Sequence, residues 1–398
     1  MRMALFTDTL GDINGVSRFI RTIAEQALGR GLELHVLTST RFACPERANV
    51  HNVQPRCARA MPAYPTLEVV WPDAGALGRL AERLRPDVVH VSTPGPVGMV
   101  GRRWALKRGL PLVGTYHTDF PAYVEQLLDD RVLTWVTGQW MRRFYGACAR
   151  VLTRSEEYAA TLGGLGIGED RIVRLVPGIE TEAFDIRRRD PSGAVWDAVV
   201  GARRESVKVL YVGRVSVEKN LRLLVGVWKR VAGVCRAAGR DVQLVVVGDG
   251  PYRVQMEQEL MGTGAVFAGF RHNEELATMY ASGDLFVFPS TTDTLGQAVM
   301  EAQCAGLAAL VSDRGGPSGM VEDGVTGRVL RADRPKDWEA AMLGLIEDAG
   351  LRRRMGLAGH VKIAPMSISH SFEQFWNVHE QVAREWGGWA KGESSGFD

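Results

Sequence analysis

Two carboxylates flank a glycine in the segment DTLGQAVME, which runs from Asp293 to Glu301. A short apolar run, LFVFPS, precedes this segment, and a helical pattern follows Gly296. Such a turn between a buried strand and a helix binds anions in α/β proteins, because free backbone N–H groups and the helix dipole converge there. Ionised carboxylates only accept hydrogen bonds, so Asp293 and Glu301 could bind the hydroxyl pairs of a ribose and a hexose. Alternatively, Asp293 is a plain N-cap and Glu301 a surface residue.

A pair of cations follows another apolar run, in the segment VGRVSVEKN. Arg214 comes directly after the predicted strand, and Lys219 lies near the start of the next predicted helix. Two cations at the C-terminal edge of a strand suit a diphosphate, because Arg can fork onto two oxygens while Lys acts as a point charge. The alternative is that both side chains form surface salt bridges with Glu218.

Two residues of the first half could also contact a ligand. His117, in TYHTDF, ends a predicted strand, and ligand crevices form at the C-terminal edges of parallel strands. A lone histidine is also commonly structural, so both readings stay open. Gly15, in the loop GDINGV, would let a ligand approach the backbone closely. That loop follows a first copy of TDTLG, which recurs at Thr292 in a non-equivalent position, so the two copies are not a duplication.

Composition and missing motifs exclude several classes of function. The chain has 398 residues, 45% of them hydrophobic, and a net charge of +2, which gives no nucleic-acid footprint. We find no G-x-G-x-x-G after a strand, no Walker A sequence and no G-x-S-x-G elbow. Five scattered cysteines indicate neither a disulfide framework nor a metal site. We therefore expect the protein to lie in a reducing compartment. With no signal-peptide pattern and no long apolar run, we expect a cytoplasmic protein.

Short β-branched runs alternate with helical patterns, which predicts two doubly wound α/β halves with parallel sheets. The segment 180–205 is charged, contains Pro-Ser-Gly and lacks a strand, so we expect a linker there. The segment 57–71 is expected to be a loop that helps to select the acceptor. The expected division is a first domain over 1–179, a second over 206–365, a final amphipathic helix over 366–386 and a tail over 387–398.

Taken together, these segments resemble the retaining glycosyltransferases of glycosyltransferase family 4, which have the GT-B architecture of two facing Rossmann-like domains. The resemblance covers nearly the whole chain. Its most specific parts are GRVSVEKN, VVVGDGP, TDTLGQAVMEAQCAG and VPGIETEAF. TYHTDFPAYV and TDTLGQAVMEA resemble in particular the subset that contains bacterial α-mannosyltransferases and sulfoquinovosyl-lipid synthases. The resemblance also implies that the final helix packs back on the first domain.

The resemblance assigns a role to each candidate residue of the second half. Glu301 would bind the ribose of the nucleotide, and Asp293 would bind hydroxyls of the donor sugar. The residues that it places at the diphosphate or sugar are Arg214, Lys219, Gly296 and Gln297. Asp293 is shorter than the glutamate that is commoner in the family, and Ala309 stands where the family usually has proline.

In the first half, the resemblance places Gly15 in the glycine loop beside the diphosphate and the acceptor, and His117 against the donor sugar near the reacting carbon. NGV replaces the double glycine that many members carry near Gly15. Two departures from the family pattern, NGV near Gly15 and aspartate in place of glutamate at position 293, bear on which donor is used.

The activity that the resemblance implies is transfer of a mannosyl- or glucosyl-like group from a GDP- or UDP-linked sugar to a lipid or glycan hydroxyl. No metal and no further cofactor is expected, because Arg214 and Lys219 would stabilise the leaving diphosphate. Contact of the first domain with the inner face of the membrane is also expected. Two alternatives belong to other classes: a nucleotide-sugar epimerase of the same fold, and a catalytically silent nucleotide-sugar-binding scaffold.

Overall fold

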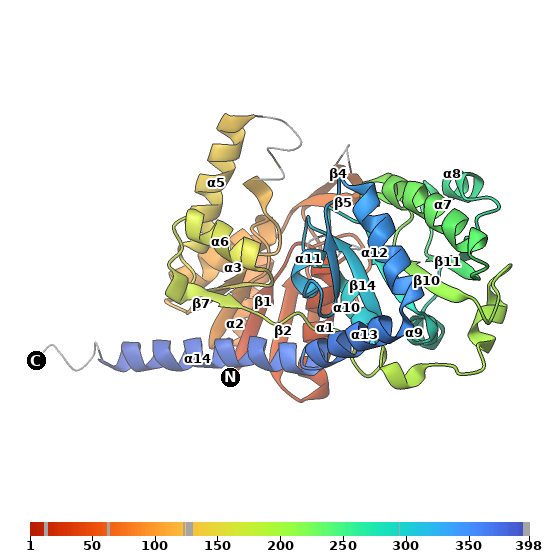
Figure 1. Ribbon diagram of the computed structural model, residues 1–398. Helices are drawn as coiled ribbons and strands as arrows, with labels where there is room; N and C mark the ends of the chain where they lie inside the picture. The colour runs from red at the N-terminus through yellow and green to blue at the C-terminus, as the bar shows by residue number, and fades with distance from the viewer. Residues whose placement is uncertain (12–14, 62–63, 122–123, 125–129, 294, 393–398) are drawn as a thin grey trace, which may run out of the picture. The chain divides into compact units, whose positions relative to one another are not determined.

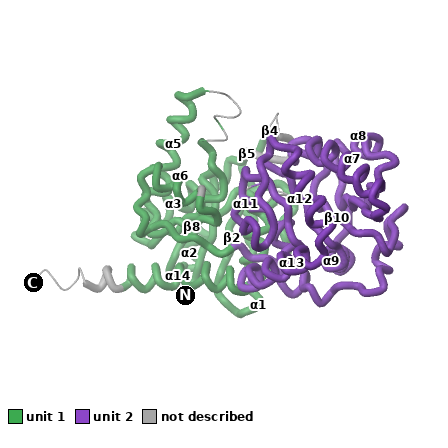
Figure 2. Tube along the Cα trace, viewed as in Figure 1, with its two compact units in different colours: residues 1–176, 369–398 green, residues 177–368 purple. Residues whose placement is uncertain are grey.

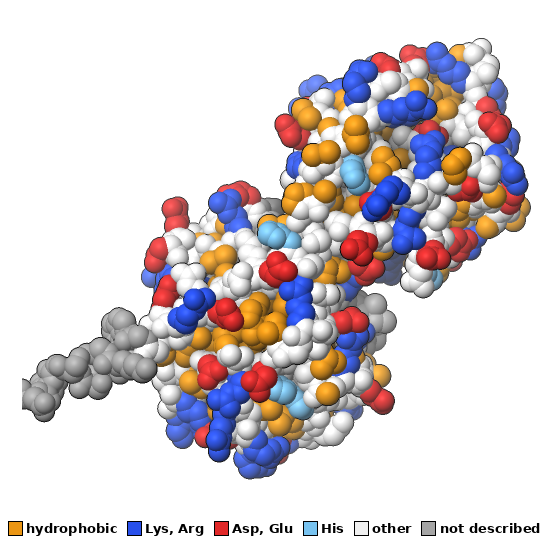
Figure 3. Space-filling model, turned by 90° about the horizontal axis from the view of Figure 1, so that it is seen from below, with side chains coloured by type: hydrophobic (Ala, Val, Ile, Leu, Met, Phe, Trp, Pro, Cys, Tyr) orange, Lys and Arg blue, Asp and Glu red, His pale blue; other side chains and the backbone are white. Residues whose placement is uncertain are grey.

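A computed structural model describes residues 1–11, 15–61, 64–121, 124, 130–293 and 295–392 (Figure 1). The chain divides into two compact units (Figure 2). Unit 1 contains Met1–Val176 and Ser369–Asp398, and unit 2 contains Pro177–Ile368. On the face drawn in Figure 3, positive and negative side chains are interspersed, in keeping with the small net charge.

Unit 1 is built on a parallel sheet with the strand order β3-β2-β1-β6-β7-β8-β9. The strands are short and almost wholly apolar, because helices cover both faces of the sheet. Their bounds are β1 Arg2–Phe6, β2 Glu33–Thr38, β3 Val50–Asn52, β6 Val88–Val91, β7 Leu112–Thr115, β8 Arg150–Thr153 and β9 Ile172–Arg174. Most of these strands are the short β-branched runs that indicated a parallel sheet, whereas β3 has only three residues and too little pattern to recognise.

The helices of unit 1 bury one face each against this sheet. Their bounds are α1 Gly15–Gly29, α2 Ala74–Leu84, α3 Pro96–Lys107, α5 Arg131–Tyr145, α6 Glu156–Gly164, the 3-10 turn η1 Glu169–Arg171 and α14 Ile368–Gly392. Phe372, Phe375 and Trp376 of α14 join the core that α1 forms with the sheet. The helix runs on through residues that were expected as a tail, and only 393–398 lie outside the described residues.

A buried chain of hydrogen bonds ties α14 to the sheet. His379 Nδ1 lies 2.7 Å from the carbonyl oxygen of Phe375, so this nitrogen carries the hydrogen. His379 Nε2 therefore accepts from His90 Nδ1 at 2.9 Å, and His90 Nε2 accepts from the Thr115 hydroxyl at 3.2 Å. Burial lowers the pKa of His379 to about 4 and holds the pKa of His90 well below its ordinary value. Both rings are therefore neutral at pH 7.

We predict that acid loosens this attachment. The unfolded chain takes up protons on both histidines near pH 6.5. In the folded chain the pKa of His379 is lowered to about 4, and the pKa of His90 lies well below 6.5. Stability is therefore fully present above pH 6.5 and falls as the pH drops from 6.5 towards 4. Denaturant unfolding at pH 7 and pH 5 should show a smaller loss in His379→Leu than in wild type. The exposed His370 on the same helix provides a control, His370→Gln; equal losses in all three proteins would contradict the prediction.

The segment 57–71 is a β-hairpin, not a loop as the sequence suggested. Strand β4 Cys57–Met61 pairs with β5 Tyr64–Trp71 in antiparallel register, outside the main sheet. The proline inside YPTLEVVW argued against a strand, because proline occurs in strands mainly at the edge of a sheet. It is tolerated here because both strands of a two-stranded ribbon are edge strands.

Unit 2 is built on a second parallel sheet with the order β12-β11-β10-β13-β14-β15. Its strands are β10 Val207–Val212, β11 Val242–Val247, β12 Val266–Gly269, β13 Leu285–Phe288, β14 Ala308–Ser312 and β15 Gly327–Leu330. The other elements are η2 Ile186–Arg188, η3 Ala194–Ala198, η4 Val217–Lys219, α7 Leu221–Ala237, α8 Arg253–Glu259, α9 Asn273–Ser282, α10 Gln297–Cys304, α11 Pro317–Met320, α12 Pro335–Glu347 and α13 Ala349–Ile363.

The segment 180–205 is part of unit 2 and not a linker. Phe184, Trp196 and Val199 are buried in the core of the unit, although charged residues surround them in the sequence. The buried ammonium group of Lys208 donates to the carbonyl oxygens of Arg204 at 3.3 Å and Ser206 at 2.9 Å, which fixes the end of the segment. Composition misled the prediction here, because three apolar anchors hold an otherwise polar stretch in place.

Each sheet has a point where the strand order reverses direction. In unit 1, β1 lies between β2 and β6, and in unit 2, β10 lies between β11 and β13. Ligands of doubly wound folds bind outside the carboxyl ends of the strands at such points. The candidate residues should therefore be sought in the loops that follow β1 and β6 and those that follow β10 and β13.

Candidate active site

The loops at the reversal point of unit 2 are joined by an ion pair between two of the candidate residues. Lys219 Nζ lies 2.9 Å from each carboxylate oxygen of Asp293. Lys219 ends η4 after β10, and Asp293 follows β13. The two side chains are 19% and 26% exposed, so the pair is accessible to a ligand. Asp293 is thus not a plain N-cap, and Lys219 pairs with it and not with Glu218.

Glycines allow the loops of this edge to approach one another closely. A Cβ atom on Gly248, which follows β11, would lie 2.1 Å from the carbonyl oxygen of Gly213, which follows β10. A Cβ atom on Gly250 would lie 2.4 Å from the carbonyl oxygen of Val215. The GDGP segment of the sequence is therefore required by backbone contact between loops, and it holds the segment that carries Arg214 and Lys219.

Arg214 lies on the same loop and is exposed. Its carbonyl oxygen accepts a hydrogen bond of 2.9 Å from the buried Tyr211 hydroxyl, which fixes the backbone, while the guanidinium group is in no ion pair within the described ranges. The alternative, a salt bridge with Glu218, is not formed among the described residues. The pKa of Glu218 is lowered mainly by its hydrogen bond to Ser216 and, to a smaller extent, by the positive charges of Arg214 and Lys219. Arg214 thus presents an unpaired cation to solvent.

Helix α10 begins at this edge. Its N-cap is Gly296 in the left-handed conformation, with φ 73°, and a Cβ atom there would lie 2.8 Å from the Cα of Pro317. No side chain among the described residues caps the helix, so the backbone N–H of Gln297 is available to an anion. The first turn contains no acidic residue that would compete for these groups.

Glu301 lies one turn further along α10 and is only 7% exposed. The hydroxyl of the buried Tyr280, on α9, donates to its Oε2 at 3.2 Å. Glu301 is therefore not a surface residue, the alternative that the spacing left open. A buried carboxylate needs hydrogen-bond donors, and Tyr280 orients it from behind.

His117 occupies the corresponding edge of unit 1, directly after β7. Its Nε2 lies 3.1 Å from the Ser92 hydroxyl oxygen, which follows β6, and its ring packs edge-on against Phe19 at 5.4 Å. Burial, helped by the charge of Arg154, lowers the pKa of His117 to about 3. The imidazole is therefore neutral at pH 7; it can exchange hydrogen bonds with a sugar hydroxyl but holds no proton to donate as an acid.

The sequence analysis missed Asp8, which organises the loop after β1. Its carboxylate accepts from the Thr93 hydroxyl at 2.7 Å and from the backbone N–H of Val97 at 2.7 Å and Gly98 at 3.2 Å. Burial raises the pKa of Asp8, and these hydrogen bonds oppose the rise. Asp8 thus caps α3 from a distant loop. The sequence feature that could have identified Asp8 is its position in the first TDTLG copy, directly after a strand.

Gly15 begins α1, and the neighbouring residues 12–14 lie outside the described residues. A Cβ atom on Gly15 would meet no protein atom within 4 Å, so the packing of the chain does not require glycine there. This differs from Gly296, where glycine is needed for the fold itself.

We therefore predict that Gly15→Ala separates function from stability. The melting temperature should stay equal or rise slightly, because Ala favours a helix over Gly by about 1 kcal/mol. Turnover should fall if a substrate approaches this backbone closely. Thermal melts and initial rates on one preparation would check both parts, and full activity with unchanged stability would remove Gly15 from the site.

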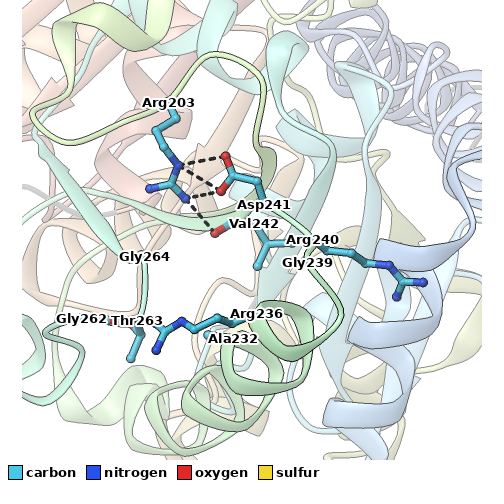
Figure 4. Close-up of a pocket in the computed structure, with 10 residues that line it drawn as sticks. All are labelled: Arg203, Ala232, Arg236, Gly239, Arg240, Asp241, Val242, Gly262, Thr263 and Gly264. Atoms are coloured by element: carbon cyan, nitrogen blue, oxygen red, sulfur yellow. Dashed lines mark hydrogen bonds and ion pairs between the residues drawn. The ribbon is translucent and has the colours of Figure 1, made fainter.

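Unit 2 also contains an arginine-lined cavity of about 480 Å³ that is not a candidate anion site (Figure 4). It lies near the N-terminal ends of β10 and β11, away from the edge that carries Lys219. Arg203 pairs with Asp241, Arg236 donates to the Gly262 carbonyl oxygen, and Arg240 pairs with Glu347. Its positive charges are therefore already engaged.

Three further properties bear on the site. Within the described ranges, no group of three or more His, Cys, Asp or Glu side chains is placed to hold a metal ion. The five cysteines, which all lie in the described part of the chain, are free thiols. No helix among the described residues has the length and apolar character to cross a bilayer.

Two family models match the chain, one in each half. The model of Glycosyltransferase Family 4 matches residues 13–183, and the model of Glycosyl transferases group 1 matches residues 195–361. A GDP-mannose-dependent alpha-mannosyltransferase of Mycobacterium tuberculosis is 31% identical over 346 residues, 83% of this chain and 84% of that protein. The sulfoquinovosyl transferase SQD2 of Arabidopsis thaliana is 30% identical over 283 residues, which cover 69% of this chain and about half, 53%, of SQD2.

Solved structures show the same fold. HepE of Anabaena, in complex with UDP, superposes with a TM-score of 0.73 at 16% identity, covering 96% of this chain and 100% of HepE. Sucrose-phosphate synthase of Thermosynechococcus elongatus gives a TM-score of 0.72 at 18% identity, covering 96% of this chain and 99% of that enzyme. The two Rossmann-like units therefore make up a GT-B fold, as the resemblance implied.

The fold, the matches in both halves and the relatives that span most of the chain all agree. The chain belongs to glycosyltransferase family 4, and it is a glycosyltransferase that takes its sugar from a nucleotide sugar.

Proposed function

We propose that this enzyme transfers a hexosyl group from a GDP- or UDP-linked sugar to a lipid hydroxyl, with retention of configuration and without a metal. The observation that carries the proposal is the cationic edge of unit 2, where Lys219, the exposed Arg214 and the start of α10 converge. This edge can hold the diphosphate. GDP-mannose is the donor to test first, because the mycobacterial relative is named for it.

In the proposed reaction, the acceptor hydroxyl attacks the anomeric carbon from the face on which the diphosphate leaves. The bond from this carbon to the phosphate oxygen breaks, a bond to the acceptor oxygen forms, and the acceptor proton passes to the departing phosphate. Arg214 and Lys219 stabilise the charge that builds on the diphosphate. Asp293 and the neutral His117 hold sugar hydroxyls, and Glu301 binds the ribose. No step needs an acid with a pKa near 7.

The product of the purified enzyme tests this proposal. GDP-mannose has an α-linked sugar, so retention would give an α-linked product, which the one-bond C–H coupling of the anomeric carbon identifies by NMR. Transfer should continue at an unchanged rate in excess chelator. A β-linked product would contradict the retaining mechanism, and loss of activity on chelation, restored by one divalent ion, would contradict metal independence.

A lipid acceptor and contact with the inner face of the membrane are supported by helix α5. Val132, Trp135, Val136 and Trp140 follow one another at helical spacing and are exposed, Trp135 by 65%. The opposite face of α5 buries Met141, Phe144 and Tyr145 in unit 1. Exposed tryptophans on one helix face are typical of membrane interfaces, because the ring combines an apolar body with a polar N–H.

The charge of the same region favours an anionic bilayer. Helices α3 and α5 carry three basic residues each and no acidic residue. The last carbonyl groups of α5 are bound by Arg102, which donates to Phe144 at 3.2 Å, and by Arg171, which donates to Gly146 at 2.9 Å. Arg142 and Arg143 remain exposed beside a hollow of about 660 Å³. We propose that the apolar face enters the bilayer while these arginines meet lipid phosphates.

We predict that Trp135→Ser weakens binding to vesicles by about tenfold or more, since burying one large apolar side chain contributes about 1.5–3 kcal/mol. Co-sedimentation with vesicles of phosphatidylcholine, with and without phosphatidylglycerol, measures the partition. Leu357→Ser, which changes an exposed leucine of α13 in unit 2, is the matched control. Wild-type protein that stays in solution with both vesicle types would contradict membrane contact and favour a glycan acceptor.

A further inference from the structure

Arg154 is a cation for which the described residues of unit 1 provide no hydrogen-bond or ion-pair partner. It follows β8, and its Nε is buried without a hydrogen bond in the described part of the chain. The guanidinium carbon lies 5.1 Å from the centre of the Phe19 ring, so one face of the group rests on an aromatic side chain. Burial and the charge of Arg18 lower the pKa of Arg154 to about 10, and no carboxylate offsets this effect. A cation whose Nε is buried without a hydrogen bond is costly for stability and calls for an explanation.

Arg18 adds a second unpaired positive charge at the same place. It is exposed on the first turn of α1 and is in no ion pair among the described residues. Arg21, one turn further, differs from it, because its guanidinium group donates to the Leu10 carbonyl oxygen at 2.8 Å and is thus used within the fold. Arg18 precedes Phe19, whose ring lies 5.1 Å from the guanidinium carbon of Arg154, so both arginines lie beside the same residue. The positive charge of Arg18 helps to lower the pKa of Arg154.

The nearby groups do not neutralise this pair. His117 is uncharged at pH 7 and shares the Phe19 ring with Arg154. Asp8, the carboxylate in the loop after β1, is engaged by Thr93 and by the N-terminus of α3. Both arginines come from elements that meet at the C-terminal edge of the sheet, next to the reversal point of unit 1, where doubly wound folds bind ligands.

We propose that Arg18 and Arg154 form a binding site for an oxyanion carried by a substrate, such as a phosphate, sulfonate or carboxylate group, beside His117. The planar guanidinium fork matches the oxygens of such groups, and two converging forks select a charged substrate over a neutral one. The anion would also end the repulsion between the two arginines. It could belong to the acceptor or to the sugar of the donor. This inference rests on the proposed function only where it calls the ligand a substrate.

Titration with inorganic phosphate and with sulfate tests the site directly. The diphosphate edge of unit 2 would also bind phosphate, so every protein carries Arg214→Ala and Lys219→Ala. Calorimetry at constant ionic strength should then show saturable binding that Arg18→Gln or Arg154→Gln weakens by about tenfold or more, the change that 1.4 kcal/mol produces. Arg103→Gln, at an exposed arginine of α3, should leave the affinity unchanged. If Arg154→Gln fails to fold, the exposed Arg18 decides the test. No saturable binding, or equal binding in all variants, would overturn the site.

Turnover by the otherwise unmodified enzyme identifies which substrate carries the anion. Phosphatidylglycerol, a lipid with a phosphate group, is compared with the neutral diacylglycerol as acceptor, and UDP-glucuronate with UDP-glucose as donor. A preference for the charged acceptor that disappears in Arg154→Gln assigns the site to the acceptor. A preference for the charged donor that disappears in Arg154→Gln assigns the site to the donor sugar. No preference in either pair would overturn the assignment to a substrate. If the proposed transfer were wrong, no donor would give turnover. The phosphate titration does not depend on turnover and would still show whether Arg18 and Arg154 bind an anion.

Discussion

Lys219→Ala should lower kcat by about 100-fold or more, the scale of losing one preorganised contact to charge that develops in the transition state. Lys219 lies in the loop after β10, at the point where the strand order reverses between β10 and β13. Its ammonium group is already held 2.9 Å from both oxygens of Asp293. Such fixed placement is what makes an electrostatic contact effective in catalysis, because the group need not reorganise as the diphosphate departs. Initial rates at saturating donor and acceptor measure the effect.

The same substitution leaves Asp293 without its partner, so a role in catalysis must be separated from a role in holding Asp293. A double-mutant cycle with Asp293→Ala does this. If Lys219 only holds Asp293 in place, Lys219→Ala should cost nothing further once Asp293 is removed; if it stabilises the diphosphate, most of the loss should remain. Lys229→Ala, at an exposed lysine of α7, is the control and should keep wild-type turnover. Normal turnover in Lys219→Ala would remove Lys219 from the site.

Glu301→Ala should weaken nucleotide binding by about 1.5–3 kcal/mol, the range for a hydrogen bond to a charged group. Glu301 is buried in α10, and the Tyr280 hydroxyl orients it. A carboxylate held in this way can accept both hydroxyl groups of a ribose without losing much side-chain freedom. Calorimetric titration with GDP and UDP measures the change, which corresponds to about 10- to 150-fold in the dissociation constant.

Loss of Glu301 also removes an acceptor of the Tyr280 hydroxyl, so stability must be followed in parallel. Glu301→Gln keeps the shape and one acceptor oxygen and should bind nucleotide with an intermediate affinity. Tyr280→Phe should have a smaller effect on binding, because it removes only the support of the carboxylate. A folded Glu301→Ala protein with wild-type affinity would show that the ribose lies elsewhere.

The strands of both sheets could largely be predicted, because parallel strands covered on both faces are continuous apolar runs such as Val242–Val247. The edges at which Lys219, Asp293 and His117 lie could be predicted for the same reason, since each follows a recognisable strand. That Lys219 and Asp293 bond to one another could not, because they are 74 residues apart and no local pattern relates them.

Other parts of the site leave no local signal in the sequence. Tyr280 reads as an ordinary helix residue, and only the fold shows that its hydroxyl reaches Glu301. Arg154 follows a strand like many arginines, and its lack of a partner is a property of three-dimensional packing. The segment around Trp196 has the charge of a linker, yet three buried apolar side chains, those of Phe184, Trp196 and Val199, hold it in unit 2. Burial and pairing depend on distant parts of the chain, whereas strand and helix patterns are local.

Thermal unfolding in the presence of nucleotides tests most directly whether this chain uses a nucleotide sugar through the edge described in unit 2. GDP, UDP and ADP and their common sugar conjugates would each be added to the purified protein, because a ligand that binds only the native state raises its apparent stability. We expect a clear rise in melting temperature with one nucleotide family, GDP or UDP, and this result would fix the base of the donor. No rise with any of the three families would contradict the central claim.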